Sequence, residues 1–306
     1  METQSPSSSA PPVLLVGTDF SDPAAAALEW AVELARQQGA RLELVHAVSV
    51  PPAIPGYVPA ADLNFSVDVE RAARARLEQA AAALGAQGTE VSIYLAVGVP
   101  SRVILDRAEE IGAAGVVMGT RGLTGAQHLL LGSTTERVVH AARCPVLAVH
   151  PEDRGQHRPI RSILVPTDFS ADAELAIATA HRLLAPLGQD ARLILIHAFN
   201  LPVEYTAYGP IPTSLNFLKD TGLEAERRLF ETAQRLEREG LTVETVAREG
   251  DPAHVIAAEA QARGADLIAM GTHGHSGLHH LLLGSTAERV VQHARCPVMT
   301  IRRPKD

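Results

Sequence analysis

The sequence Gly119-Thr-Arg-Gly122, followed after nine residues by Gly132-Ser133, occurs again as Gly271-Thr-His-Gly274 and, nine residues later, Gly284-Ser285. A short apolar run precedes each stretch and a helical pattern follows it, which predicts a glycine-rich loop between a buried strand and a helix N-terminus. Backbone N–H groups and the helix dipole attract a phosphate to such a loop, and the two serines lie where a hydroxyl can cap the helix and touch the ligand. One copy would equally fit a tight turn, but two copies favour a phosphate site.

The two loops belong to a repeat that covers most of the chain. Thr18-Asp-Phe-Ser21 returns as Thr167-Asp-Phe-Ser170, and Gly98-Val-Pro100 returns as Gly250-Asp-Pro252. The copies are offset by 149 residues at the aspartates and by 152 at the Gly-Ser pairs, so almost no insertion separates them. A period this long indicates duplicated domains and not a solenoid. We therefore expect a disordered tail over residues 1–12, one domain over 13–150, a linker over 151–160 and a second domain over 161–306.

Short β-rich runs alternate with longer helical patterns in each copy, which predicts an α/β fold with a parallel sheet and helices on both faces. The first copy is expected to have strands near 13–18, 41–48, 90–97, 115–119 and 145–150, and helices near 22–38, 67–86, 100–112 and 133–143. The second is expected to have strands near 162–167, 191–199, 241–248, 265–271 and 297–302, and helices near 171–187, 216–239, 252–263 and 285–294.

Each copy has an aspartate where its first strand ends. Ligands of such sheets bind beyond the carboxyl ends of the strands, so Asp19 and Asp168 are expected to flank the same crevices as the glycine loops. There each aspartate would either accept hydrogen bonds from ligand hydroxyls or amino groups, or cap the next helix.

The composition narrows the possible functions. The 306 residues are 46% hydrophobic and 20% charged, which is typical of a soluble globular protein. A net charge of −8 without clustered Lys and Arg argues against nucleic-acid binding. No run of eighteen apolar residues would span a membrane, and residues 1–12 lack the basic start and apolar middle of a signal peptide, so a cytoplasmic location is expected. Cys144 and Cys296 are expected to be buried residues at strand starts and not disulfide partners.

Each half of the chain resembles a domain of the universal stress protein family. The resemblance rests on the two Gly-x2-Gly-x9-Gly-Ser stretches, the aspartate after the first strand and the His-Ala run that ends the second strand, and it covers nearly the whole chain. It implies two tandem Rossmann-like domains, each with a five-stranded parallel sheet of order 3-2-1-4-5 flanked by helices. It also implies that Val146–Val149 and Val298–Ile301 pair antiparallel as an intrachain pseudo-dimer, which leaves a further homodimer open.

The resemblance further implies ATP as the ligand, with or without Mg²⁺. The aspartate would contact adenosine, the alanine backbone the adenine edge, and the glycine loop the ribose and phosphates. The matching positions of the first copy are Gly17, Thr18, Asp19, Ala47, Gly119, Thr120, Arg121, Gly122, Gly132, Ser133 and Thr134. Those of the second are Pro166, Thr167, Asp168, Ala198, Gly271, Thr272, His273, Gly274, Gly284, Ser285 and Thr286. Because Gly17 and Arg121 stand where the second copy has Pro166 and His273, the two affinities need not be equal.

The residues around the loops indicate nucleotide binding and not fast catalysis. No Gly-x4-Gly-Lys-(Ser/Thr) sequence supplies a P-loop lysine, and no carboxylate lies between Gly119 and Thr135 or between Gly271 and Ala287. We therefore expect no catalytic residue and at most weak ATP hydrolysis. The favoured function is a nucleotide-dependent stress-response regulator with an unknown protein partner. A slow ATPase or adenine-nucleotide hydrolase, and a stress scaffold with a structural nucleotide, are the alternatives.

Histidines are the last candidates for chemistry. His273, His275, His279 and His280 could bind Zn²⁺ or Ni²⁺. No Cys or carboxylate accompanies them and the first copy has only His128 there, so we expect imidazoles that face solvent or phosphate and no metal site. His46 and His197 lie in buried strand patterns and are expected to be core residues with satisfied hydrogen bonds.

Overall fold

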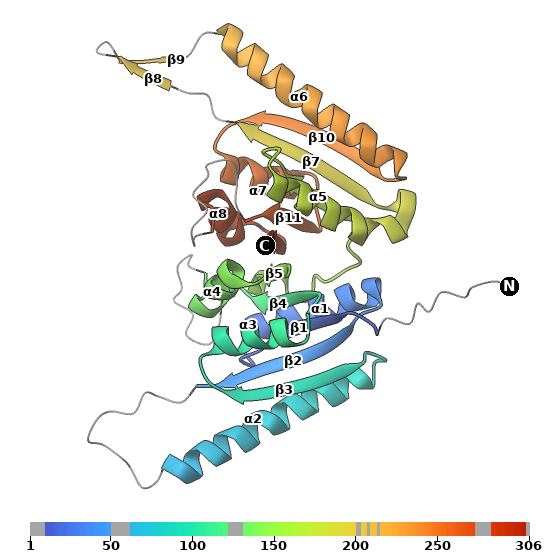
Figure 1. Cartoon of the computed structure of the whole chain (residues 1–306), viewed down its shortest axis with the longest axis vertical. Coiled ribbons are helices and arrows are strands. Elements are labelled where there is room, and N and C mark those ends of the chain that lie inside the picture. Colours follow the sequence, from blue (N-terminus) through green and yellow to red (C-terminus); the bar gives the residue numbers. More distant parts are fainter. Residues whose placement is uncertain are drawn as a thin grey trace, which may run out of the picture.

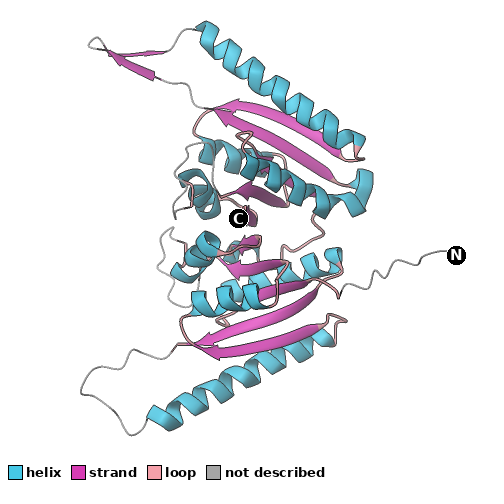
Figure 2. Ribbon diagram, in the orientation of Figure 1, coloured by secondary structure: helices cyan, strands magenta, loops and turns pink. Residues whose placement is uncertain are grey.

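A computed structural model describes residues 10–49, 62–121, 131–199, 203–206, 209–212, 215–272 and 283–303. Two α/β domains follow one another along the chain, and their strands join into one ten-stranded sheet (Figure 1). The strand order β10-β7-β6-β11-β12-β5-β4-β1-β2-β3 contains the order 3-2-1-4-5 twice, so the predicted fold is confirmed. Figure 2 shows the strands as a layer between helices.

The elements of the first domain lie close to the predicted ranges. They are β1 (Val13–Gly17), α1 (Asp22–Gln38), β2 (Arg41–Val48), α2 (Asp62–Gly85), β3 (Val91–Val97), α3 (Pro100–Glu110), β4 (Gly115–Gly119), α4 (Ser133–Ala141) and β5 (Val146–Val149). The main difference is α2, which begins five residues before the expected start near residue 67.

The second domain repeats this order with one addition. Its elements are β6 (Ser162–Pro166), α5 (Ala171–Leu184), β7 (Arg192–Phe199), β8 (Val203–Thr206), β9 (Gly209–Pro212), α6 (Leu215–Arg238), β10 (Thr242–Glu249), α7 (Pro252–Ala262), β11 (Leu267–Gly271), α8 (Ser285–His293) and β12 (Val298–Ile301). The antiparallel hairpin β8–β9 was not predicted. Two short 3₁₀ helices, η1 (Pro151–Asp153) and η2 (Ala185–Asp190), were not predicted either.

The central strands are apolar along their length because both faces of the sheet are covered. Every residue of β1, β4 and β5 is buried, as is typical of parallel strands between two helix layers. One apolar cluster joins the sheet to α1, α2, α5 and α6, and a second joins its other face to α3, α4, α7 and α8. Both clusters contain residues of both domains, so the two halves share their cores.

The domains meet at β5 and β12, the two central strands of the sheet. These strands pair antiparallel, with Thr300 opposite Val146, Met299 opposite Leu147 and Val298 opposite Ala148, which confirms the predicted pairing. Thr300 adds a side-chain bond, because its Oγ1 donates to the carbonyl oxygen of Val146 at 3.3 Å. In this way the last strand of each domain is protected from solvent by the other.

The segment expected to be a linker packs against both domains. His150 and Asp153 are buried, and Trp30 Nε1 of α1 donates to the Asp153 carbonyl oxygen at 3.2 Å. Ile160 is also buried, and the amide of Gln37 binds its backbone twice: Gln37 Nε2 donates to Ile160 O at 2.9 Å, and Ile160 N donates to Gln37 Oε1 at 3.2 Å. These contacts attach α1 of the first domain to the start of the second.

The two cysteines differ from the prediction in burial and position. Cys144 and Cys296 are free and only partly buried, and they lie in the bend before β5 and β12. Burial raises the pKa of Cys144 from 9.0 to about 11. It raises the pKa of Cys296 to about 12, with a smaller contribution from the charges of Asp153 and Asp266.

In the part of the chain that the structure describes, no helix is long and apolar enough to cross a membrane.

Replacing Gln37 by leucine should destabilise the protein. The backbone N–H and C=O of Ile160 lose their partner, and leaving buried polar groups unsatisfied costs about 1–3 kcal/mol. Urea denaturation of the full chain measures this change. Gln38→Leu is the matched control, because the side chain of Gln38 makes no hydrogen bond to the described residues. An equal loss in both variants would contradict the role of Gln37.

The raised thiol pKa values predict an unusual pH dependence of alkylation. In the native protein the rate with iodoacetamide should keep rising about tenfold per pH unit between pH 8 and 10, because only the thiolate reacts and both pKa values lie above this range. In urea the same rate should level off above the ordinary pKa of 9.0. A plateau near pH 9 in the native protein would show that the thiols are not protected by burial.

Candidate functional site

Each domain has a cavity at the carboxyl ends of its strands. The cavity of the first domain has a volume of about 440 Å³, and that of the second about 340 Å³. The predicted residues that line the first are Gly17, Thr18, Asp19, Ala47, Gly119, Arg121, Gly132, Ser133 and Thr134. Those that line the second are Pro166, Thr167, Asp168, Ala198, Gly271, Thr272, Gly284, Ser285 and Thr286. The duplicated motifs therefore meet around one cavity in each domain.

A few predicted positions do not follow this pattern. Thr120 is buried, with 3% exposure, and does not line the first cavity. Its backbone N–H donates to Val149 O, and its carbonyl oxygen accepts from Gly132 N. Thr120 therefore connects the end of β4 to β5 and to the N-cap of α4. Gly122, His273 and Gly274 lie outside the described residues, as do His128, His275, His279 and His280. Within the described ranges, no group of His, Cys, Asp or Glu side chains is arranged to hold a metal ion.

The two aspartates shape the turn that enters the first helix of each domain. Asp19 Oδ1 accepts a hydrogen bond from Ser21 N at 3.0 Å, and Asp168 Oδ1 accepts one from Ser170 N at the same distance. The helix caps are the serines themselves, whose hydroxyls accept from the helix backbone at 3.3 Å. Of the two roles that the sequence left open, helix capping is therefore taken by serine, and the aspartate lines the cavity.

The residue after each aspartate has a strained backbone. Phe20 has φ 64° and Phe169 has φ 65°, the left-handed region that bulky residues rarely adopt. Each phenylalanine amide donates to a threonine hydroxyl, Thr18 Oγ1 at 3.0 Å or Thr167 Oγ1 at 2.9 Å. The strain costs on the order of 1 kcal/mol at each position. It turns the chain sharply, so that the aspartate lies at the cavity while the next residues begin a helix.

Aromatic and cationic side chains stack on these phenylalanines in both domains. The Phe20 ring lies 4.6 Å from the His46 ring and 4.1 Å from the guanidinium carbon of Arg76 on α2. The Phe169 ring has the same neighbours in His197 at 4.9 Å and Arg228 on α6 at 4.0 Å. These contacts offset part of the backbone strain and attach the long helices α2 and α6 to the site.

The histidines of β2 and β7 were predicted to be buried core residues, but they are more exposed than predicted. His46 and His197 are only partly buried, and His46 lines the first cavity. Their hydrogen bonds are satisfied as expected, since each Nδ1 lies 2.7 Å from a carbonyl oxygen, that of Thr18 or Thr167. A carbonyl can only accept, so Nδ1 carries the proton.

The glycine loops lead directly into α4 and α8. Gly132 and Gly284 are the N-caps and have no capping side chain, so Ser133 and Ser285 are the first helical residues and do not cap. Gly132 N donates to Thr120 O at 2.8 Å, and Gly284 N donates to Thr272 O at 2.9 Å. The first turns of both helices line the cavities, and uncapped N–H groups at a helix N-terminus favour an anion.

Two glycines bring the start of one helix against the end of a neighbouring strand. A Cβ at Gly119 would lie 2.7 Å from the carbonyl oxygen of Pro23, and a Cβ at Gly271 would lie 3.0 Å from backbone and side-chain atoms of Asp172. At Gly119 only glycine therefore allows α1 to begin directly beside β4, and at Gly271 a larger residue would have to displace Asp172 slightly at the start of α5.

Apolar residues that sequence reasoning missed form the remaining wall of each cavity. They come from α3 and α7, namely Pro100 and Ile104 in the first domain and Pro252 and Ile256 in the second. The repeated Gly-x-Pro motif at Gly98 and Gly250 was the available signal, because it marks the entry to these helices. Arg121 adds a cation to the first cavity, 3.5 Å from Glu152.

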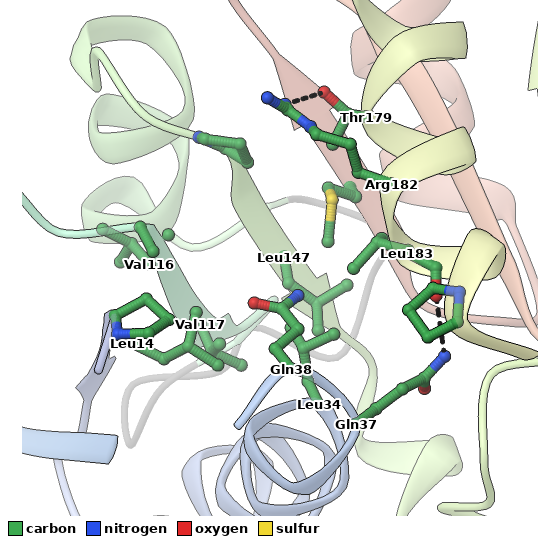
Figure 3. A pocket seen from close by; sticks show the side chains of 16 residues that line it. Leu14, Leu34, Gln37, Gln38, Val116, Val117, Leu147, Thr179, Arg182 and Leu183 are labelled. Atoms are coloured by element: carbon green, nitrogen blue, oxygen red, sulfur yellow. Dashed lines mark hydrogen bonds between the residues drawn. The ribbon is translucent and has the colours of Figure 1, made fainter. Parts of the chain in front are cut away.

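A further cavity of about 490 Å³ lies at the opposite, amino ends of the strands. It opens between α1 and α5 at the domain seam, and Figure 3 shows Leu34, Val117, Leu147 and Leu183 around it. Its lining is mostly apolar, and none of the described residues that line it belongs to a glycine loop or to the first turn of an α-helix. The duplicated cavities at the carboxyl ends, each of which contains an aspartate and the first turn of a helix, are therefore the stronger candidates for a functional site.

Comparisons with known proteins agree with this architecture. A family model described as the universal stress protein family matches residues 13–150 and 159–302. The chain is 31% identical over 298 residues to a universal stress protein of Mycolicibacterium smegmatis, covering 94% of this chain and 96% of that one. It is 30% identical over 300 residues to one of Mycobacterium tuberculosis, with the same coverage. The crystal structure of a universal stress protein from Archaeoglobus fulgidus shares the fold, with a TM-score of 0.71 and 22% identity over 96% of this chain and 97% of that one.

Replacing Gly119 by alanine should damage the first site and the fold around it. The new methyl group collides with Pro23 O at 2.7 Å, and such overpacking costs about 1–3 kcal/mol. Thermal or urea denaturation measures the loss. Gly85→Ala is the control, since a Cβ there has no atom within 4 Å and alanine favours the helix by up to about 1 kcal/mol. Equal stability of the two variants would show that the close approach of α1 to β4 is not needed.

Proposed function

Because the chain belongs to the universal stress protein family, we propose that it binds ATP in both domains and that nucleotide occupancy regulates a protein partner during stress. One observation carries the proposal. In each domain an aspartate, an alanine at a strand end and the first turn of a glycine-loop helix line a single cavity, although they lie far apart in the sequence. If the repeated glycine motifs were only tight turns, there would be no reason for them to lie around the same cavity as the aspartate and the alanine.

The lining of the first cavity suits the parts of a nucleotide. Apolar residues such as Ile104 and Met118 offer flat contact for an adenine ring, and the β2 backbone around Ala47 offers hydrogen bonds to its edge. The Asp19 carboxylate can accept from ribose hydroxyls. The first turn of α4, with the hydroxyls of Ser133 and Thr134, offers donors and a favourable dipole to the phosphates.

The same lining supports holding ATP over hydrolysing it. Among the described residues that line the cavities, Asp19 and Asp168 are the only acids, and they lie at the ends of β1 and β6 and not at the helix N-termini. A water that attacks the terminal phosphate would need a base at the phosphate end. We therefore propose slow turnover, with any Mg²⁺ held by phosphates, water and hydroxyls such as Ser133.

The proposed regulatory role rests on α4 and α8, which begin at the cavities and pack against the core that both domains share. α4 and α8 begin at the cavities, and their buried valines, among them Val138 and Val290, pack in the cluster that contains residues of both domains. A ligand that orders the first turns of these helices therefore acts on elements that belong to the domain seam. A partner that contacts the seam or its surroundings can respond to occupancy.

Introducing aspartate at the helix N-termini should abolish nucleotide binding without unfolding the protein. Ser133 and Ser285 are exposed, and an acid in the first helical turn is favourable to the helix, whereas its charge repels a triphosphate. Calorimetric titration with ATP should give two equivalents for the wild type, one for Ser133→Asp or Ser285→Asp, and none for the double variant. Each lost site should bind at least about tenfold more weakly.

Ser133→Ala and Ser285→Ala are the controls for this experiment. They remove the hydroxyl but leave the backbone N–H groups, so binding should weaken much less than with aspartate. Two equivalents of ATP bound by the double aspartate variant, or none bound by the wild type, would contradict the proposed sites. ATP turnover well above background would favour an ATPase over a regulator.

A further inference from the structure

The first domain contributes a side chain to the phosphate-binding loop of the second. His140 lies in the last turn of α4, and its Nδ1 accepts a hydrogen bond from the backbone N–H of Leu283 at 2.8 Å. Leu283 directly precedes Gly284, the N-cap of α8. The bond therefore crosses the domain seam and ends on the backbone of the glycine loop.

This bond completes the anchoring of the loop just before the helix begins. The Leu283 side chain is 5% exposed and packs in the apolar core, while Gly284 N donates to Thr272 O at 2.9 Å. Two consecutive N–H groups are thus engaged, one by the neighbouring domain and one by the loop's own strand end. Together they determine the direction in which the first N–H groups of α8 point.

His140 is itself held in place by the second domain. The carbonyl oxygen of His140 accepts a hydrogen bond from the guanidinium of Arg302, which directly follows β12. The ring is only partly buried, and because Nδ1 accepts, the proton of the neutral imidazole is on Nε2. The interaction is therefore a directed contact between two ordered elements.

Among the described residues, the start of α4 has no equivalent of this bond, despite the duplication. The counterpart of His140 is Gln292 on α8, and its Nε2 donates to Glu288 of the same helix at 3.3 Å. Within the described ranges no side chain of α8 binds the backbone of Leu131, the counterpart of Leu283. The bond to Leu283 is thus specific to the second site.

We propose that His140 is a positioning residue of the second nucleotide site, which the first domain completes by holding Leu283 in place directly before the start of α8. This inference rests on the proposed binding of ATP. A helix start that is already held in its binding conformation loses less conformational freedom when the phosphates arrive, so the bond raises affinity at the second site without touching the ligand. The first domain thereby controls affinity in the second.

The experiment measures ATP binding by calorimetry in the Ser133→Asp background, where only the second site is filled. His140→Leu keeps the volume but removes the acceptor, and should weaken binding about two- to tenfold, the effect of one neutral hydrogen bond. His140→Asn places an acceptor where Nδ1 was and should stay within about twofold of the wild type. Gln292→Leu, the matched control on α8, should leave affinity unchanged.

A readout that needs no nucleotide separates this inference from the proposed function. Hydrogen exchange of the Leu283 amide should be several-fold faster in His140→Leu than in wild type, and protected in His140→Asn. If the wild type binds ATP but His140→Leu binds equally well, or if His140→Asn fails to restore affinity, the positioning role is overturned. If the wild type binds no ATP at the second site, the proposed function fails instead, whatever the exchange at Leu283.

Discussion

The antiparallel pairing of β5 with β12 is the constraint on which the rest of the molecule depends. It places the last strands of two copies of one domain side by side and makes a single sheet whose two apolar cores both cross the seam. Because interiors are close-packed, a change of packing at the seam is transmitted to the elements of both domains that border it. α4 and α8 are such elements, and each also begins directly after a glycine that lines a candidate site. The seam and the candidate sites are therefore parts of one structure.

A second constraint acts within each domain, where an unfavourable backbone conformation is kept in both copies. Phe20 and Phe169 have positive φ angles, which a glycine would adopt more easily, yet both rings are stacked by a histidine and an arginine. The side chain is needed for the stack, and the stack attaches α2 or α6 to the end of the first strand. The turn then holds Asp19 or Asp168 at the cavity while a serine caps the helix that follows. Strain of this kind persists only where the surroundings over-determine it, and it lies here beside the candidate site.

Duplication has not produced two equivalent halves. The second domain is preceded by a packed segment whose Ile160 is held by Gln37 of α1, and its Leu283, directly before α8, donates a hydrogen bond to His140 of α4. The support is one-sided because the counterpart of His140 is Gln292, which bonds within its own helix. α4 has nine residues and is about 13 Å long. One end of this helix thus lies at the first site and the other touches the loop of the second.

The sequence by itself determined the duplication, the order of strands and helices apart from β8, β9 and the two 3₁₀ helices, the two glycine loops and about half of the residues that line the cavities. These features are local or periodic: apolar runs, serine and proline at helix starts, and a motif repeated at a constant offset. Three things required the tertiary structure. The roles of Asp19 and Ser21 depend on a turn whose positive φ at Phe20 no motif predicts. The apolar residues that α3 and α7 contribute to the cavities depend on how these helices cross the ends of the strands. The contact of His140 with Leu283 joins residues 143 positions apart, and only the pairing of β5 with β12 brings them together. Long-range contacts are set by packing across the whole sheet, which no stretch of sequence encodes alone.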